Sequence, residues 1–326
     1  MNRNRMAVPL AICVWIAAAR LAASSQKAED GIKLYEAGRH ADARAMLEAA
    51  VREDPKDARA AGYLGRVLLA TDELEAAVDR LEKAVALDPK SSELALWLGR
   101  AYGMQAIRAN FLKQVSLAGK VKKAFEKAVE LDDSNLDARF SLIDYYLQAP
   151  GIMGGSVEKA REQAAEIARR DTMKGYRATG RIAEYEKKFD AALAAYERAG
   201  KEFPGKREPF FWIAGSYSRQ KQYGKAFDAM EKLQTEQPAE KPLACFQIGV
   251  FSAVSGERLE RGEECLKLYL QREPKSDEPS LASAHYRLGQ LYEKKGNREQ
   301  AKREYSAALS LNPSHRDARQ ALKKIS

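Results

Sequence analysis

The stretch Arg287–Pro313, RLGQLYEKKGNREQAKREYSAALSLNP, decides the fold of this chain, because its pattern occurs a second time in Tyr63–Pro89, YLGRVLLATDELEAAVDRLEKAVALDP. The two stretches can be laid over each other without a gap. They share a Leu-Gly pair, two Ala columns and a closing Pro: Leu288, Gly289, Ala301, Ala308 and Pro313 fall on Leu64, Gly65, Ala77, Ala84 and Pro89, while Tyr305 falls on Leu81. Self-similarity at a fixed period predicts an array of similar structural units.

The spacing has a direct physical interpretation. Pro55 and Pro89 are 34 residues apart, and so are Pro204 and Pro238. Proline cannot continue a helix, so each of them is expected to follow the second helix of a unit. Small residues at fixed positions let helices approach closely, and large residues fill the space between them. Each unit buries its apolar faces only against its neighbours, which predicts a solenoid without a central core rather than a helical bundle.

This pattern resembles the tetratricopeptide repeat, a helix-turn-helix unit with the signature W-x2-L-G-x2-Y…A-x3-F…P. The second-helix part returns as Ala43, Leu47, Ala50, Pro55; as Ala192, Tyr196, Ala199, Pro204; as Ala226, Met230, Leu233, Pro238; and, more weakly, as Gly262, Leu266, Tyr269, Pro274. The resemblance implies an all-α, right-handed superhelical solenoid. We expect about eight units over residues 24–315, beginning near residues 24, 58, 92, 136, 173, 207, 242 and 282, and a C-terminal capping helix over 316–326.

Two units depart from the pattern. The third carries an insertion near residues 104–119, and the fourth carries "APGIMGGS" at 149–156. A Gly-rich loop before a helix is how many proteins bind phosphate, but the chain lacks the G-x4-G-K-[ST] of a phosphate-binding loop. We interpret 149–156 as a lengthened turn, in which Gly supplies positive φ angles and Ser156 caps the next helix. Ile152 and Met153 are expected to be exposed there and to suit a partner contact.

Residues 1–23 have the layout of a secretory signal peptide, with Arg3 and Arg5 before an apolar run from Met6 to Ala19. The run is shorter than the roughly 20 residues that a membrane-spanning helix needs. We therefore expect cleavage, after Ala19 or Ala23, and export to the periplasm or beyond. The alternative is an uncleaved signal anchor that holds the chain at the membrane.

The charge of the chain argues against a nucleic-acid partner. Cleavage after Ala23 would remove three arginines and no acid, which lowers the formal net charge from +9 to +6. The remaining Lys and Arg alternate with Glu and Asp along nearly every predicted helix, as on solvated helix faces with i,i+4 pairs, and form no long basic block.

Cys245 and Cys265 are the cysteines that an exported chain would retain. They fall on the two helices of one predicted unit, about one turn out of register. Export permits a disulfide, but the register favours two separately buried thiols.

The sequence shows no catalytic constellation. His40, His285 and His315 lie in different units, and neither H-E-x-x-H nor C-x-x-C occurs. We therefore expect a protein that is not an enzyme and that needs no metal or cofactor.

Proteins that resemble this array usually hold a peptide or a partner helix in a concave groove lined by the first helix of each unit. Two columns of residues are expected to face that groove. The first holds Leu96, Phe140, Arg177, Phe211, Phe246 and Tyr286, and the second holds Arg66, Arg100, Asp144 and Arg181. The aromatic residues of the first column are equally compatible with packing between helices. The Lys and Asn carboxylate clamp of some relatives is not reproduced, because Gly62 and Leu96 stand at the Asn positions.

The sequence thus predicts a non-catalytic protein-protein interaction scaffold of an exported compartment, whose partner is an acidic and apolar protein or peptide. Two alternatives stay open. One is a membrane-anchored or intracellular co-chaperone or assembly adaptor, which requires that the N-terminal segment be retained. The other is a solenoid that binds an envelope polysaccharide along its aromatic column.

Overall fold

The computed structural model describes residues 24–275 and 278–326. The predicted signal segment, residues 1–23, lies outside them. The chain divides after Asp133 into two compact units, which are described separately below as the N-terminal unit and the C-terminal unit. All regular secondary structure in the described ranges is helical.

The N-terminal unit contains three antiparallel helix pairs. They are the helix over residues 24–36 with α2 (His40–Glu53), α3 (Ala58–Ala70) with α4 (Leu74–Leu87), and α5 (Ser92–Arg108) with α6 (Phe111–Leu131). Side-chain caps begin three of these helices: Asp57, Ser91 and Asn110 each accept a hydrogen bond from the backbone N–H three residues later.

The C-terminal unit contains five further pairs and a final helix. They are α7 (Leu136–Gln148) with α8 (Val157–Arg170), α9 (Thr172–Tyr185) with α10 (Phe189–Glu202), α11 (Glu208–Arg219) with α12 (Tyr223–Glu236), α13 (Lys241–Ser255) with α14 (Leu259–Leu270), α15 (Leu281–Lys294) with α16 (Arg298–Leu311), and α17 (Arg316–Ile325). Two short 3-10 helices, η1 (Gly151–Met153) and η2 (Pro238–Glu240), lie in connections.

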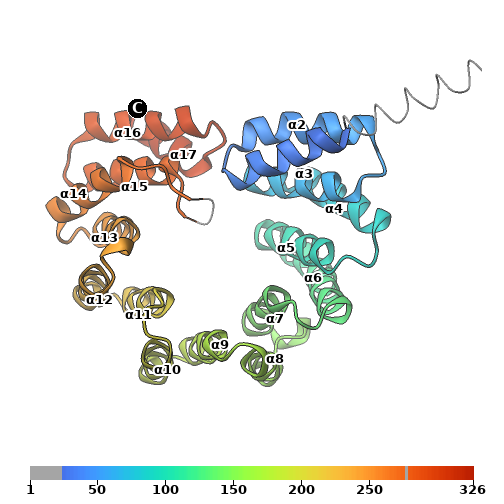
Figure 1. Ribbon diagram of the computed structural model, residues 1–326, viewed down its shortest axis with the longest axis horizontal. Helices are drawn as coiled ribbons and strands as arrows, with labels where there is room; N and C mark the ends of the chain where they lie inside the picture. The colour runs from blue at the N-terminus through green and yellow to red at the C-terminus, as the bar shows by residue number, and fades with distance from the viewer. Residues whose placement is uncertain (1–23, 276–277) are drawn as a thin grey trace, which may run out of the picture. The chain divides into compact units, whose positions relative to one another are not determined.

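The pairs are stacked so that each unit has two layers. We call the first helices of all pairs the first-helix layer and the second helices the second-helix layer. In the C-terminal unit, α7, α9, α11 and α13 line the inner side of an arc, and α8, α10, α12 and α14 lie outside them (Figure 1). The inner side of the arc is therefore formed by first helices, as the sequence predicts.

Small residues sit where two helices of a pair approach most closely. A Cβ atom built on Gly65 would lie 2.5 Å from Cγ of Leu81, and one on Gly289 would lie 2.5 Å from Cε1 of Tyr305. Such distances are shorter than non-bonded carbon atoms allow. The Leu-Gly signature is thus a packing requirement: the large residue of the second helix occupies the space that a side chain on the first helix would need.

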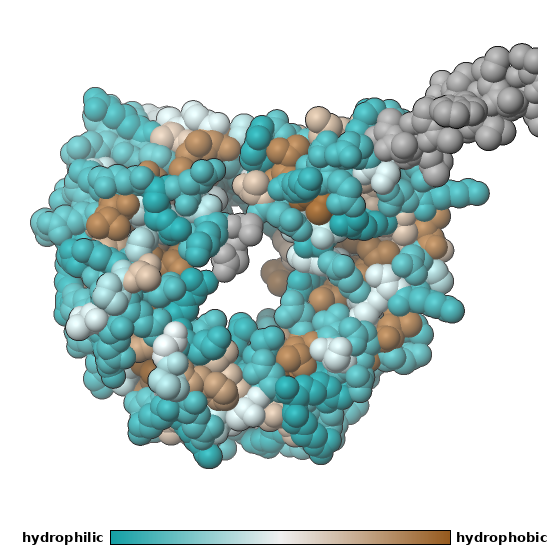
Figure 2. Space-filling view, viewed as in Figure 1, coloured by the Kyte–Doolittle hydropathy of each residue, from teal (hydrophilic) through white to brown (hydrophobic). Residues whose placement is uncertain are grey.

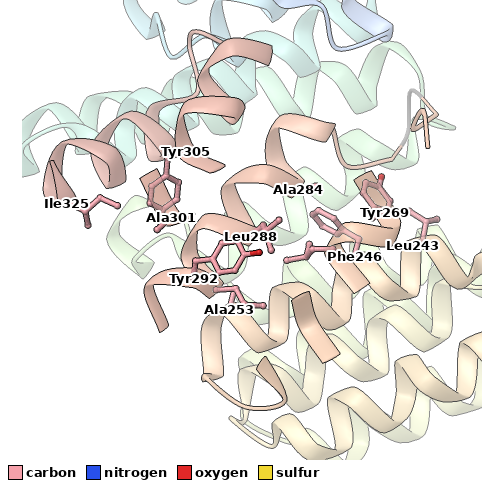
Figure 3. Close-up of a cluster of buried hydrophobic side chains, with 12 residues drawn as sticks. Leu243, Phe246, Ala253, Tyr269, Ala284, Leu288, Tyr292, Ala301, Tyr305 and Ile325 are labelled. Atoms are coloured by element: carbon pink, nitrogen blue, oxygen red, sulfur yellow. The ribbon is translucent and has the colours of Figure 1, made fainter. Parts of the chain in front are cut away.

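The core continues from pair to pair instead of gathering at one centre. Figure 3 shows one such cluster, in which Phe246 and Tyr269 of one pair meet Leu288 and Tyr305 of the next. At its end Ile325 of α17 is buried against the last pair, so that α17 covers the apolar face that has no further repeat to pack on.

An ionic contact joins α14 to the end of α15. Burial alone would raise the pKa of Glu263, but hydrogen bonds from Lys267, Lys295 and Tyr292 lower it to about 2. The carboxylate is therefore ionised throughout the neutral pH range and links two successive repeats.

The segment 149–156 is a turn between the two helices of the fourth pair. Gly154 has a φ of 95°, which favours glycine, and the Ser156 hydroxyl accepts a hydrogen bond from the Lys159 N–H, so the cap prediction is confirmed. The turn also requires glycine at position 155, for a steric reason and not because of the φ angle. A Cβ there would lie 1.8 Å from the carbonyl oxygen of Ala149, so only glycine fits.

The prediction of two separate thiols is wrong. Cys245 of α13 and Cys265 of α14 form a disulfide, and their Cα atoms are 4.5 Å apart. Counting residues along two antiparallel helices placed the two cysteines one turn out of register. In the structure Leu266 packs directly against Gly249, and in this register the neighbouring Cys265 lies opposite Cys245.

Candidate partner-binding surface

Three aromatic rings and two guanidinium groups gather on the first-helix layer of the N-terminal unit. We call Tyr35, Tyr63, Arg66, Trp97 and Arg100 the aromatic-arginine cluster. The Arg66 guanidinium carbon lies 4.9 Å from the ring centroid of Tyr35, 4.1 Å from that of Tyr63 and 4.4 Å from that of Trp97. Arg100 lies 4.6 Å from the Trp97 ring. These distances are those of cation-π contacts.

Arg66 is the centre of the cluster and is largely enclosed. Only 15% of its side chain is exposed, its Nη1 atom donates to Glu93 at 2.8 Å, and its buried Nε has no hydrogen-bond partner within the described part of the chain. Arg66, which was predicted to face the groove, is thus already engaged by residues of its own unit. Its guanidinium pairs with Glu93 and contacts three rings, and Arg100 lies beside one of them, the Trp97 ring.

His40 borders the cluster and adds no charge to it. Its ring centroid lies 5.6 Å from that of Tyr35, and burial lowers the pKa of His40 below its ordinary value. A histidine with a lowered pKa is neutral at pH 7.

The first-helix layer of the C-terminal unit carries a second set of aligned residues. Arg177 of α9 lies 4.8 Å from the ring centroid of Phe140 on α7, and Nε of Arg181 donates to Asp144 at 3.1 Å. Arg177 is exposed, and Phe140 and Arg181 are partly exposed. These contacts join neighbouring first helices, as the two predicted columns require. Phe211 of α11 is half-buried and packs against both neighbouring cores.

A further ion pair on this layer was missed by the sequence analysis. Arg219 of α11 donates to Glu184 of α9, whose side chain is nearly inaccessible to solvent. A glutamate within the helical pattern carries no signal of burial, because most glutamates lie on solvated faces. The pair leaves half of the Arg219 side chain exposed at the surface.

Three predicted groove residues do not offer a free side chain. Leu96 is buried with 3% exposure and Phe246 with 9%, so neither can contact a partner. Phe246 is part of the cluster in Figure 3, where it packs on Tyr269 with ring centroids 5.0 Å apart. Tyr286 is half-buried between Tyr305 and His315. At these three positions the residues of the first column pack between helices instead of facing the groove.

The loop of the fourth pair has one exposed apolar residue rather than two. Ile152 is 85% exposed. Met153 is partly buried, and its carbonyl accepts a hydrogen bond from the Tyr145 hydroxyl.

These arrangements present side chains that can contact a partner. Across the described ranges, no three His, Cys, Asp or Glu side chains are placed to hold a metal ion. Among the helices of the same ranges, none combines the length and apolar character needed to cross a membrane. The first-helix layer presents aromatic rings with arginine side chains beside them.

The stacked pairs define a helical-repeat solenoid. Three family models, each described as tetratricopeptide repeat, match residues 34–96, 177–241 and 282–315. The chain belongs to the tetratricopeptide repeat proteins, which confirms the family and the fold class expected from the sequence. Proteins of this family are in general non-catalytic scaffolds that bind protein or peptide partners.

Solved structures of similar fold come from the same family. A thermophilic tetratricopeptide repeat protein of Thermus thermophilus has 19% identity and a TM-score of 0.50, and the match covers 60% of this chain and 98% of that one. A tetratricopeptide repeat protein from Parabacteroides merdae is matched less well, with 13% identity, a TM-score of 0.48 and coverage of 93% and 98%. No curated protein sequence matches significantly.

Proposed function

We propose that this protein is an exported scaffold that holds an apolar and acidic segment of a partner protein against its first-helix layer. The observation that carries this proposal is the aromatic-arginine cluster, where one enclosed arginine contacts the rings of Tyr35, Tyr63 and Trp97 and a second arginine lies beside the Trp97 ring. Rings held in this way lose little conformational entropy on binding, because they are already ordered.

The chemistry of the surface selects the partner. Aromatic residues and arginine are the side chains most enriched among binding hot spots. Arginine forms charge-assisted, often bidentate hydrogen bonds with carboxylates. Both units carry an arginine on the face of an aromatic ring. These pairs are Arg100 with Trp97 in the N-terminal unit and Arg177 with Phe140 in the C-terminal unit. A partner segment that alternates apolar and acidic side chains can place the apolar ones on the aromatic rings and the acidic ones on the arginines.

Two features support export. Residues 1–23 have the layout of a signal peptide, and the disulfide between Cys245 and Cys265 is of a kind that persists in oxidising compartments. We expect mass spectrometry of the exported product to find its N-terminus between about residues 20 and 26, where the apolar run gives way to small residues. Recovery of only the full-length chain, in the membrane fraction, would instead favour the anchored adaptor.

Substitutions on the first-helix layer test the binding surface. A partner is first captured by crosslinking in the native compartment, and its dissociation constant is then measured. We expect Trp97→Ala or Phe211→Ala to weaken binding by about 1 to 3 kcal/mol, mainly through faster dissociation. Arg100→Glu combined with Arg181→Glu should slow association and reduce its salt dependence, because charges at the surface steer an acidic partner even where they are only partly exposed.

The matched control lies on the second-helix layer. Lys232 of α12 is 65% exposed and pairs only loosely with Glu236, at 3.6 Å, and Lys232→Glu should leave binding unchanged. Circular dichroism confirms that each variant is folded. If the first-helix variants bind as tightly as the parent while deletion of residues 152–155 abolishes binding, the loop of the fourth pair is the contact and the proposal is wrong. Capture of a polysaccharide in place of a protein would favour the envelope-binding alternative.

A further inference from the structure

The pair α5 and α6 is longer than the others and ends in an exposed apolar turn. The two helices have 17 and 21 residues, while the remaining helices of the pairs within α2–α16 have 12 to 15. At the turn between them Ile107 is 78% exposed, Phe111 61% and Leu112 81%, and Val115 on the next turn of α6 is 43% exposed. The insertion predicted near residues 104–119 is thus an extension of both helices that carries large apolar side chains into solvent.

This gathering is unusual for the molecule. The face shown in Figure 2 is mostly hydrophilic, and its apolar patches are small and separate. The other large apolar residues that are strongly exposed, such as Ile152 and Leu311, occur singly. Singly exposed apolar residues need no explanation, but several at one protruding turn mark an interaction surface.

The charged residues of the segment that forms this turn are all cationic. From Leu94 to Phe125 the sequence contains no Asp or Glu, whereas it contains six cations: Arg100, Arg108, Lys113, Lys120, Lys122 and Lys123. Acids of other segments approach two of them, since Arg108 pairs with Asp72, and Lys120 lies 3.7 Å from Glu82. Lys122 lies 3.7 Å from Glu126 on its own helix. Lys113 and Lys123 are exposed.

Helical geometry places an apolar residue and a lysine on the same outer side of α6. α6 buries Leu117, Val121 and Phe125 against its partner helix. At 3.6 residues per turn, Leu112 and Lys123 lie on the opposite side of the helix. Large apolar side chains together with lysines are also the residue types by which amphipathic helices bind a membrane interface.

We infer that the α5–α6 turn docks on the surface of a lipid bilayer that contains anionic headgroups. Ile107, Phe111 and Leu112 enter the boundary between headgroups and acyl chains, and Lys113 and Lys123 face the lipid phosphates. The turn combines exposed apolar side chains with exposed lysines, which fits a lipid surface that is apolar inside and anionic outside. Such docking would place the scaffold beside a membrane.

Quenching by brominated lipid tests this inference in the full chain. In a Trp15→Phe background, which removes the indole of the N-terminal apolar run, one variant carries Leu112→Trp and the matched control carries Ile152→Trp, an equally exposed site in the C-terminal unit. The vesicles contain phosphatidylcholine with brominated acyl chains, with or without phosphatidylglycerol. The native Trp97 and Trp212 are present in both proteins, so the difference between the variants reports on the new indole.

We expect the indole at position 112 to shift to the blue and to be quenched, more strongly with phosphatidylglycerol, and the indole at 152 to be unaffected. Adding Lys113→Gln and Lys123→Gln should reduce the apparent vesicle affinity reported at position 112 on the order of tenfold, because each basic residue near an anionic surface contributes to binding. Equal quenching at 112 and 152, or none at 112, would overturn the inference. So would a blue shift at 112 that depends on protein concentration and needs no lipid, because the turn would then dock on a second copy of the chain.

Discussion

Replacing Gly289 by leucine is expected to lower the free energy of unfolding of the C-terminal unit by about 3 kcal/mol, at the upper end of typical overpacking costs. A Cβ at this position would already lie 2.5 Å from the ring of Tyr305, and Tyr305 is fully buried. The ring cannot move aside without displacing α16 from α15. Urea unfolding followed by circular dichroism gives the free energy.

Gly224→Leu is the matched control for this substitution. Gly224 is also a helical glycine of the C-terminal unit, near the start of α12, but apart from its chain neighbours and the backbone of its own helix no atom of the described residues lies within 4 Å of the place where its Cβ would be. Leucine has a higher helix propensity than glycine, so this variant should be as stable as the parent or more so. Equal stability of the Gly289→Leu and Gly224→Leu variants would show that the repeat register is wrong.

Removing the disulfide should have an effect of similar size. Cys265→Ala is expected to cost about 3 kcal/mol, since the bridge closes a loop of 20 residues and restricts the unfolded chain. Reduction of the parent protein should lower its stability by a comparable amount. The variant itself should be insensitive to reductant, which makes it the control for other effects of the reagent. If both cysteines of the unfolded parent react with an alkylating agent before reduction, the bridge is absent in solution.

Most of the fold can be predicted from the sequence because the same packing constraints recur in each repeat. The Leu-Gly pair, the Ala columns and the closing Pro mark places where two helices nearly touch or where one ends, and these constraints are local. The expected unit starts near residues 24, 58, 92 and 136 lie at the first helices of the first four pairs. The same reasoning extends to α17, whose amphipathic sequence follows the last repeat.

The binding surface is less predictable, because it depends on how far each helix is rotated against its neighbours. Leu96 was expected in the groove, but the adjacent Trp97 is the residue that meets Arg66 and Arg100. A shift of one position turns a side chain by about 100° around a helix, which is enough to exchange a buried residue for an exposed one. An aromatic residue next to the assigned column, followed three residues later by Arg, was the available signal.

The central claim of this account is that the first-helix layer holds a partner protein. Site-specific photo-crosslinking tests it most directly, with a photoreactive residue placed at Arg100 in one protein and at Lys232 in another, both expressed in the native compartment. We predict a discrete protein adduct from position 100, competed by an excess of the purified partner, and no specific adduct from position 232. A specific adduct that forms at position 232 and not at position 100 would contradict the account.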